Sequence, residues 1–139
     1  MPSPPPQPLP PPSASSSSSS IISHWIRGNE IGSGSFGRVS LAINRANGEL
    51  FAVKSVARSG CASEEALKNE FRILSGLHSP HVVRCLGGDQ TLEDGVPTLN
   101  LFMEYMGGGN LTDMMKKFGC CPLEEPLVRV YTRGILQGL

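Results

Sequence analysis

Three glycines, Gly32, Gly34 and Gly37, stand at the spacing G-x-G-x-x-G in the segment IGSGSFGRVSLAI. Such a loop can hold phosphate groups, because a backbone without side chains lets several N–H groups approach an anion. Three ligand-binding architectures use this spacing: a dinucleotide-binding fold, a Walker A loop, and a glycine hairpin folded over the phosphates of a nucleotide. A glycine-rich turn without a ligand is a fourth alternative, and the loop alone does not choose among them.

The residues that follow Gly37 exclude two of these architectures. A dinucleotide-binding fold needs a helix directly after the glycines, so that the helix N-terminus meets the pyrophosphate. Here Val39, Leu41 and Ile43 occupy alternate positions, which predicts a strand. A Walker A loop ends in Gly-Lys-Ser/Thr, whereas this loop continues with Arg38 and Val39. The glycine hairpin and the plain turn remain.

Two charged residues stand among apolar neighbours further along the chain. Lys54 lies in the apolar segment FAVKSVA. Glu70 lies between Leu67 and Leu74, beside the apolar face of a predicted helix. A buried ammonium or carboxylate without a partner is costly. We therefore expect Lys54 to meet an anion, a carboxylate or both, and Lys54 and Glu70 can satisfy each other across a sheet–helix interface. Taken singly, each could instead be a surface residue whose charged end reaches solvent.

Hydrophobic periodicity predicts an α+β fold in which a sheet and a helix position these residues. An antiparallel meander comes first, because Asn47-Gly48 is a strong hairpin signal between two strand patterns. Glu64 and Glu65 lie where the first turn of the helix is expected, which suits the helix dipole. We predict strands over 24–34, 36–43 and 50–56, a helix capped by Ser63 and ended by Ser79-Pro80, strands over 82–86 and 98–106, and a polar connection over 87–97.

Two further helices are predicted after the segment Gly107–Asn110. The first is short, with Asn110 as its N-cap and Gly119 just past its end. The second begins near Pro126 and continues to Leu139. Its apolar face consists of Leu127, Val130, Tyr131, Ile135 and Leu139. We expect this face to be uncovered, which would leave the isolated chain marginally stable and prone to association.

Together, the glycine loop, FAVK around Lys54 and NEFRIL around Glu70 resemble the signature set of a protein-kinase N-lobe. The segments LFMEYMGGGNL and PLVRVYTRGILQGL resemble the kinase hinge and the first long helix of the C-lobe. The segments HWIRGNEIGSGSFGRVSLAIN and HSPHVVRCLG are similar to those of MAP kinase kinase kinases, especially plant ones. The resemblance implies a partial kinase domain over 24–139, with a five-stranded antiparallel sheet and helix αC in an N-lobe at 24–106, and the start of a C-lobe at 107–139.

The resemblance also implies a role toward ATP for each matching residue. Lys54 would bind the α- and β-phosphates and pair with Glu70. Ser35 and Phe36, with the three glycines, would cover the phosphates. The residues expected at the adenine are Ile31, Val39, Ala52 and Leu111, with Met103 at the gatekeeper position and Glu104 and Met106 offering hinge backbone groups.

Kinase chemistry needs the catalytic Asp of an H-R-D motif and the magnesium-binding Asp of a D-F-G motif. Neither motif, nor A-P-E, occurs in the sequence, which stops within the helix that leads to the catalytic loop. The resemblance implies a full-length parent that uses ATP and Mg²⁺ to phosphorylate Ser or Thr of a protein such as a MAP kinase kinase. We expect these 139 residues alone to bind ATP weakly and to transfer no phosphate.

Residues 1–23 have a different composition, rich in proline and then in serine. A segment with so few apolar side chains is predicted to be a disordered tail. Its P-x-x-P spacings could dock in an SH3- or WW-type groove. The alternative function is therefore a non-catalytic interaction module, or a truncated isoform, that binds partners through the tail or the lobe surface.

Composition excludes several other classes of protein. Lys plus Arg and Asp plus Glu each number 12, so a broadly basic nucleic-acid-binding surface is not expected. No apolar run approaches the ~18 residues of a membrane span. The four cysteines show no C-x-x-C spacing, so we expect reduced thiols and no metal site. The expected location is the cytosol or the nucleus.

Overall fold

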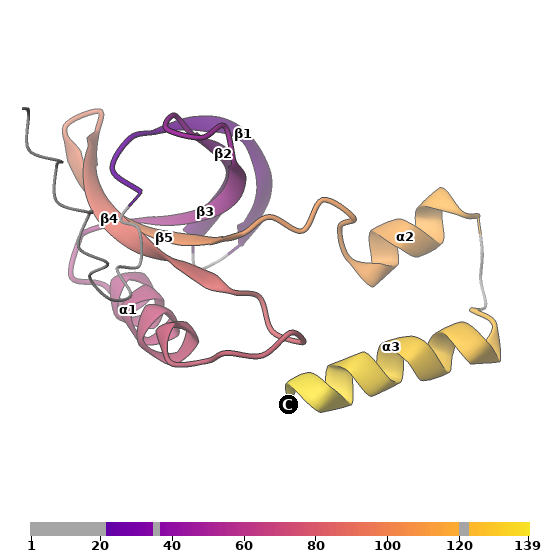
Figure 1. Ribbon diagram of the computed structural model, residues 1–139. Coiled ribbons are helices and arrows are strands. Elements are labelled where there is room, and N and C mark those ends of the chain that lie inside the picture. Colours follow the sequence, from indigo (N-terminus) through magenta and orange to yellow (C-terminus); the bar gives the residue numbers. More distant parts are fainter. Residues whose placement is uncertain (1–21, 35–36, 120–122) are drawn as a thin grey trace, which may run out of the picture.

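The structure is a computed structural model that describes residues 22–34, 37–119 and 123–139. Figure 1 shows a curled sheet with one helix against it and two helices to one side. The fold is the expected α+β architecture with a five-stranded antiparallel sheet. In chain order the elements are β1 (Trp25–Gly34), β2 (Gly37–Asn44), β3 (Leu50–Ala57), α1 (Ala62–Ser75), β4 (Cys85–Glu93), β5 (Val96–Glu104), α2 (Leu111–Lys117) and α3 (Glu125–Gly138).

The strands lie in the order β1-β2-β3-β5-β4, so β1 and β4 are the two outer strands. The hairpin predicted at Asn47-Gly48 is present between β2 and β3, and Gly48 has φ +74°, which glycine adopts without strain. Strand β1 is irregular, because its register with β2 shifts on both sides of Glu30. The first strand therefore pairs with a single neighbour through an interrupted ladder.

The strand register gives the sheet two different faces. One face packs against α1, where Leu67 meets Val56 and Leu101. The other face lies inside the curl of the sheet, where three aromatic rings pack edge to face with centroids 5.2 to 6.1 Å apart. Those rings belong to Trp25, Phe51 and Phe102. Because both faces are covered, β3 is buried along most of its length.

Helix α1 differs at both ends from its prediction. Its N-cap is Cys61 and not Ser63, and no side chain caps it. The helix ends at Ser75 with Gly76 as C-cap, several residues before Ser79-Pro80. The helix therefore ends before the proline is reached, and Gly76 itself keeps a right-handed conformation with φ −91°.

The segment around β4 is the largest error of the predicted fold. A strand was expected over 82–86 and a polar connection over 87–97, but β4 runs from Cys85 to Glu93 and a tight turn at Asp94-Gly95 leads into β5. Asp89 and Thr91 of this strand face the inside of the curl, where both bond to Asn100, so their polarity does not mark a loop. The following strand ends at Glu104 and not at Met106.

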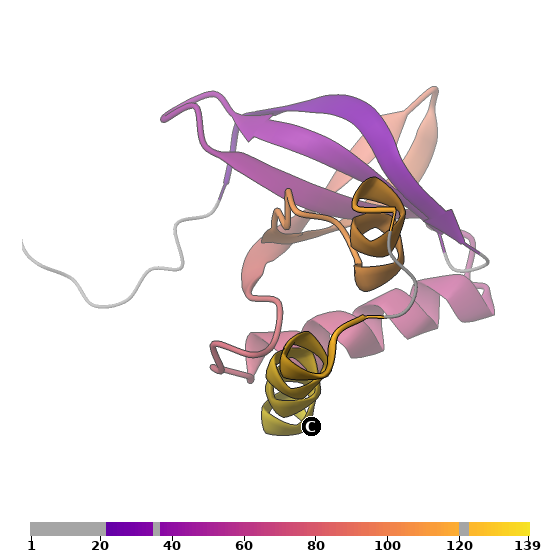
Figure 2. The same cartoon turned by 90° about the vertical axis from the view of Figure 1, so that its right-hand side faces the viewer.

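Helices α2 and α3 lie beside the sheet, whereas α1 runs beneath it (Figures 1 and 2). The predicted N-cap of α2 is confirmed, since the side chain of Asn110 accepts from the Asp113 N–H at 2.8 Å. The hydroxyl of Tyr131 in α3 lies 2.9 Å from the sulfur of Met114 in α2. Near the end of α3, a Cβ on Gly138 would lie 2.8 Å from the carbonyl oxygen of His81, so glycine permits this close approach.

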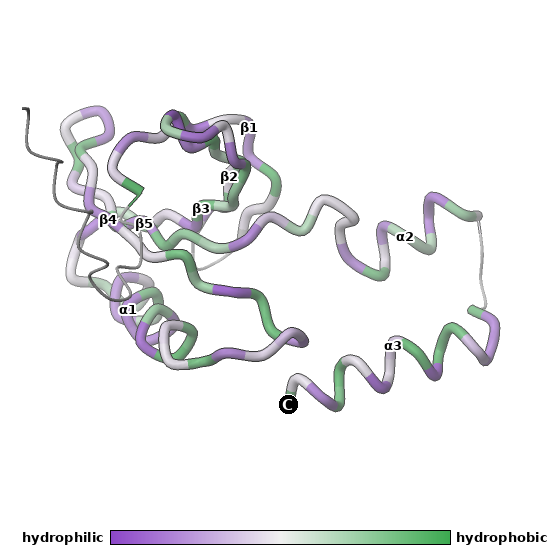
Figure 3. Tube along the Cα trace, in the orientation of Figure 1, coloured by the Kyte–Doolittle hydropathy of each residue, from purple (hydrophilic) through white to green (hydrophobic). Residues whose placement is uncertain are grey.

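Helix α3 carries apolar and hydrophilic residues along an uncovered surface (Figure 3). Within the described residues, Leu127, Val130, Ile135 and Leu139 are all exposed, as expected from the sequence. Tyr131 is half-buried because it contacts α2. None of the helices in the described ranges is long and apolar enough to cross a membrane.

Candidate functional site

The strand register gathers four predicted site residues on the face of the sheet that α1 covers. Val39 of β2 is the pairing partner of Lys54 in β3, and Ala52 of β3 is the partner of Met103 in β5. Partners in an antiparallel ladder project to the same face, and so do residues two apart on one strand. Val39, Ala52, Lys54 and Met103 therefore line one contiguous patch that spans three strands.

Lys54 and Glu70 form the ion pair expected from the sequence. Lys54 Nζ donates to Glu70 Oε2 at 2.7 Å, and each side chain remains partly exposed. Leu67 of α1 packs against Leu101, which is the pairing partner of Lys54 in β5. This packing fixes α1 beside β3, so that Glu70 meets the lysine. An ammonium has three donors, and Glu70 takes one of them. The arrangement can hold a lysine in place and present the rest of its charge to an anion.

The glycines of the loop are required for different reasons. Gly37 has φ +131°, and a Cβ there would lie 2.6 Å from the carbonyl oxygen of Ser55 and 2.8 Å from the side chain of Val56. The end of the loop thus approaches β3 more closely than any side chain permits. A Cβ on Gly32 would meet nothing nearer than Val39, at 4.0 Å. Gly34 pairs with Gly37, and the predicted residues Ser35 and Phe36 lie outside the described residues.

The predicted hinge residues lie at the end of β5 and in the segment after it. The Glu104 N–H donates to the carbonyl of Arg84 at 3.0 Å, and the Glu104 carboxylate accepts from the Arg84 N–H at 3.2 Å. The Met106 carbonyl accepts from the Gly109 N–H at 3.1 Å. The two bonds of Glu104 tie the end of β5 to the residues before β4, and the Met106–Gly109 bond closes a turn within the segment after β5. Ile31 lies in the irregular part of β1, and Leu111 is the first residue of α2, so neither belongs to the four-residue patch.

Two residues at the start of α1 have altered acidity that the sequence did not predict. Glu64 is buried, and a hydrogen bond from Lys68, the Gly60 N–H and the charge of Arg58 lower the pKa of its carboxyl group. A hydrogen bond from Ser59, together with backbone N–H groups of the first turn, lowers the pKa of the Cys61 thiol from 9.0 to about 7. The signal in the sequence is the run of small residues before the helix, which exposes its N–H groups.

Alkylation of Cys61 by iodoacetamide is expected to reach half of its maximal rate near pH 7, because the thiolate is the nucleophile. Ser59→Ala removes the largest cause of the shift and is expected to move this midpoint to higher pH. Mass spectrometry of the peptide that contains Cys61, with the Cys85 peptide as internal reference, measures the alkylation rate against pH in the wild type and in Ser59→Ala. A midpoint that does not respond to Ser59→Ala would contradict the assigned cause.

Across the ranges that the structure describes, no three His, Cys, Asp or Glu side chains lie close enough together to hold a metal ion. The patch combines an anchored cation with a glycine loop and an apolar surface. Such a combination suits a ligand with a flat apolar part and a phosphate part.

The chain is similar to known proteins of one family. The family model described as "Protein kinase domain" matches residues 25–139. The chain belongs to the protein kinase family.

Several similar proteins carry the name mitogen-activated protein kinase kinase kinase. MST11 of Pyricularia oryzae is 41% identical over 128 residues, which cover 84% of this chain and 13% of that protein. Mitogen-activated protein kinase kinase kinases 2 and 20 of Arabidopsis thaliana are 40% and 42% identical over 83% of this chain, and the matches cover 18% and 34% of their lengths. The chain thus spans about a third or less of these curated relatives.

Proposed function

We propose that residues 24–139 are the ATP-binding part of a Ser/Thr protein kinase whose relatives are MAP kinase kinase kinases. The observation that carries the proposal is the Lys54–Glu70 ion pair at 2.7 Å, on the same sheet face as Val39, Ala52 and Met103. The whole protein would transfer phosphate from ATP to Ser or Thr of a protein in a MAP kinase cascade. Its protein substrate would belong to the MAP kinase kinases.

The geometry supports a specific division of roles. Lys54 would contact the α- and β-phosphates, and Glu70 would hold it in position. The glycine loop would cover the phosphates, and the adenine would lie against the apolar patch. Since the Glu104 N–H is bonded to Arg84, the carbonyl of Glu104 is the backbone group we assign to the adenine edge. The other residues assigned to the adenine are Ile31, Val39, Ala52, Met103, Met106 and Leu111.

We further propose that these residues transfer no phosphate by themselves. The sequence contains no H-R-D and no D-F-G motif, and these motifs supply the aspartates that orient the acceptor hydroxyl and bind Mg²⁺. We therefore assign Mg²⁺ to the whole protein only. Phosphate transfer by the purified 139-residue chain that disappears in Lys54→Met would overturn this proposal.

Titration with ATP tests nucleotide binding directly. Lys54→Met is expected to weaken ATP binding by about 10- to 100-fold, because charge-assisted hydrogen bonds contribute roughly 1.5–3 kcal/mol each. Lys116→Met, which removes an exposed lysine of α2, serves as the matched control and should leave the affinity unchanged. Isothermal titration calorimetry measures both. Absence of ATP binding by the wild-type chain, or equal affinity of the wild type and Lys54→Met, would refute the assignment.

A second candidate function is supported by the proline spacing in residues 2–12, which lie outside the described residues. An extended P-x-x-P segment presents a preformed helix that SH3- and WW-type grooves bind. Binding of a peptide of residues 1–23 to such domains, retained in the full chain with Lys54→Met, would support a role as an interaction module.

A further inference from the structure

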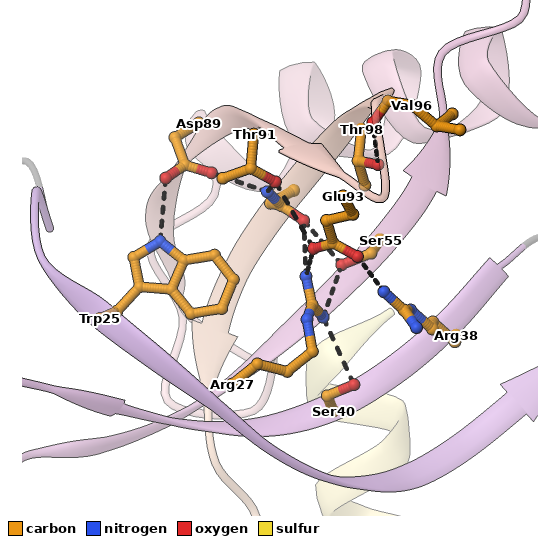
Figure 4. Close-up of polar contacts among 11 residues, drawn as sticks. Trp25, Arg27, Arg38, Ser40, Ser55, Asp89, Thr91, Glu93, Val96 and Thr98 are labelled. Carbon is orange, nitrogen blue, oxygen red and sulfur yellow. Dashed lines mark hydrogen bonds and ion pairs between the residues drawn. The ribbon is translucent and has the colours of Figure 1, made fainter.

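Charged and polar side chains gather inside the curled sheet beside Trp25 (Figure 4). They come from all five strands. Six of them are linked to one another by hydrogen bonds or ion pairs and are called the interior polar cluster: Arg27, Arg38, Ser55, Asp89, Glu93 and Asn100. Asn100 is almost fully buried and accepts from Ser55 at 2.7 Å while donating to Asp89 at 2.8 Å. The cluster is thus a connected network and not a set of isolated pairs.

Glu93, the last residue of β4, is the point where this network meets the glycine loop. Its carboxylate forms ion pairs with Arg27 of β1 and with Arg38 of β2 (Figure 4). Arg38 follows Gly37, the third glycine, directly. The two strands that flank the loop are therefore joined, through one carboxylate, to a strand at the opposite side of the sheet.

The backbone ladder holds the two ends of the loop together, since Ser33 pairs with Arg38 and Gly34 with Gly37, but it joins the loop to the rest of the sheet only through β2. Strand β1 pairs only with β2, and its register is interrupted on both sides of Glu30. The Arg38–Ser55 pair is the last register position of β2 with β3 on the loop side. Beyond this position β2 has no further register partner in β3. The pair of Glu93 with Arg38 is a contact that reaches the stem of the loop from β4.

The first arginine is well anchored, so it gives Glu93 a fixed position. Arg27 also donates to Ser55 at 3.0 Å and to Asn100 at 3.2 Å, and its guanidinium lies 5.1 Å from the ring centroid of Trp25. The Arg27 and Glu93 side chains are 21% and 25% exposed, so salt screens their attraction less than that of a fully exposed pair. Without the carboxylate, two guanidinium groups would face each other across the same space, and Arg38 would turn to solvent.

We propose that Glu93 is a positioning residue that fixes the stem of the glycine loop, through Arg38, in the place where its backbone N–H groups meet the phosphates. The inference rests on the proposed function, since it takes the nucleotide to be the ligand of the loop. It assigns to Glu93, at the end of β4, a part in phosphate recognition, although this residue lies on the face of the sheet opposite the patch that holds Lys54. Loss of Glu93 should therefore affect the phosphates more than the adenine.

The test compares the affinities of ATP and adenosine in Glu93→Gln and in Arg38→Ala. Each variant is expected to weaken ATP binding by about five- to tenfold and to change adenosine binding by less than about twofold. An effect of this size is expected because each variant removes one charge-assisted contact, the Glu93–Arg38 ion pair, which acts on the phosphates only through the loop. The double variant should be no weaker than the stronger single one, because both remove the same link. Arg38→Lys retains the charge and is expected to restore most of the ATP affinity.

Asp94→Asn is the matched control, because it removes the neighbouring carboxylate of the same hairpin at an exposed position. It should leave both affinities unchanged. Hydrogen exchange of residues 37–40 in the nucleotide-free chain gives an independent readout, and exchange should be faster in Glu93→Gln than in Asp94→Asn.

The outcomes separate the inference from the proposed function. Wild-type ATP binding that is lost in Lys54→Met but unchanged in Glu93→Gln would overturn the inference and leave the proposed function standing. Equal weakening of ATP and adenosine in Glu93→Gln would make the residue merely structural and would also overturn it. If the wild-type chain binds no ATP, both fall. Selective loss of ATP affinity with faster exchange at residues 37–40 supports the role of Glu93.

Discussion

Gly37→Ala is expected to lower the free energy of unfolding by about 3 kcal/mol, because the new methyl group meets a strained backbone and a crowded space. Gly37 has φ +131°, and a Cβ would lie 2.6 Å from the carbonyl oxygen of Ser55. A carbonyl within a paired strand cannot move aside without breaking the β2–β3 ladder. The substitution therefore costs stability even before any nucleotide is present.

Gly32→Ala is the matched variant in the same loop. A Cβ at this position has no neighbour closer than 4.0 Å, so the free energy of unfolding should change by less than about 0.5 kcal/mol. Urea denaturation followed by circular dichroism measures both variants. Equal free energies of unfolding for Gly37→Ala and Gly32→Ala would contradict the close approach of Gly37 to Ser55. A loss of ATP affinity in Gly32→Ala at unchanged stability would indicate that this glycine serves the ligand alone.

Phe102→Ala is expected to destabilise the chain by about 3–5 kcal/mol, the cost typical of emptying a buried aromatic site. Phe102 is 1% exposed and lies between Phe51 and Trp25, at 5.2 and 5.5 Å between ring centroids. The strands on either side are paired, so they cannot collapse into the cavity. This loss is a large part of the stability of an ordinary domain, which is about 5–15 kcal/mol.

Two further variants keep this prediction testable if Phe102→Ala does not fold. Phe102→Leu retains much of the volume and should cost about 1–2 kcal/mol. Phe118→Ala changes a ring that is 73% exposed and should cost less than about 1 kcal/mol. Thermal and urea unfolding of the three variants give the order. If Phe118→Ala lowered the free energy of unfolding as much as Phe102→Ala, the assignment of Phe102 to the core would be wrong.

Much of the fold could be predicted from local patterns. The Asn47-Gly48 turn, the alternation of β2 and the Asn110 cap are each decided by neighbours in the sequence. The ion pair of Lys54 and Glu70 could be anticipated as well. A charge among apolar residues needs a partner of opposite charge, and each of these two residues is such a partner for the other. Such inferences depend only on the types of the residues and on their spacing in the sequence.

The errors arose where partners lie far apart in the chain. The residues of β4 looked like a polar connection because Asp89 and Glu93 are charged, and only the curl of the sheet brings Trp25 and Arg27 to them. The true cap of α1 could not be predicted either, since Cys61 caps by backbone position and offers no side-chain bond. Ser63 has a better side chain for capping, but it lies within the helix.

The candidate site shows the same limit. The sequence placed Lys54 and Val39 in neighbouring strands, and the register then put them side by side. The different requirements at Gly37 and Gly32 could not be foreseen, because they depend on how closely β3 passes. The role we propose for Glu93 depends on a contact across 55 residues of chain, from Arg38 to the end of β4.

The curl of the sheet has a consequence for how the protein meets other chains. Outer strands with unpaired backbone groups can pair with strands of other chains and so promote aggregation. Inward-pointing charges or bulges in the outer strand prevent this pairing. Both outer strands carry both devices: Arg27 and Glu93 point inward, and the register shifts at Glu30 in β1 and between Cys85 and Gly87 in β4. The side chains that hold the loop thus also make the sheet a poor nucleus for edge-to-edge assembly. Self-association of the isolated chain would then proceed through the exposed apolar face of α3 rather than through its strands.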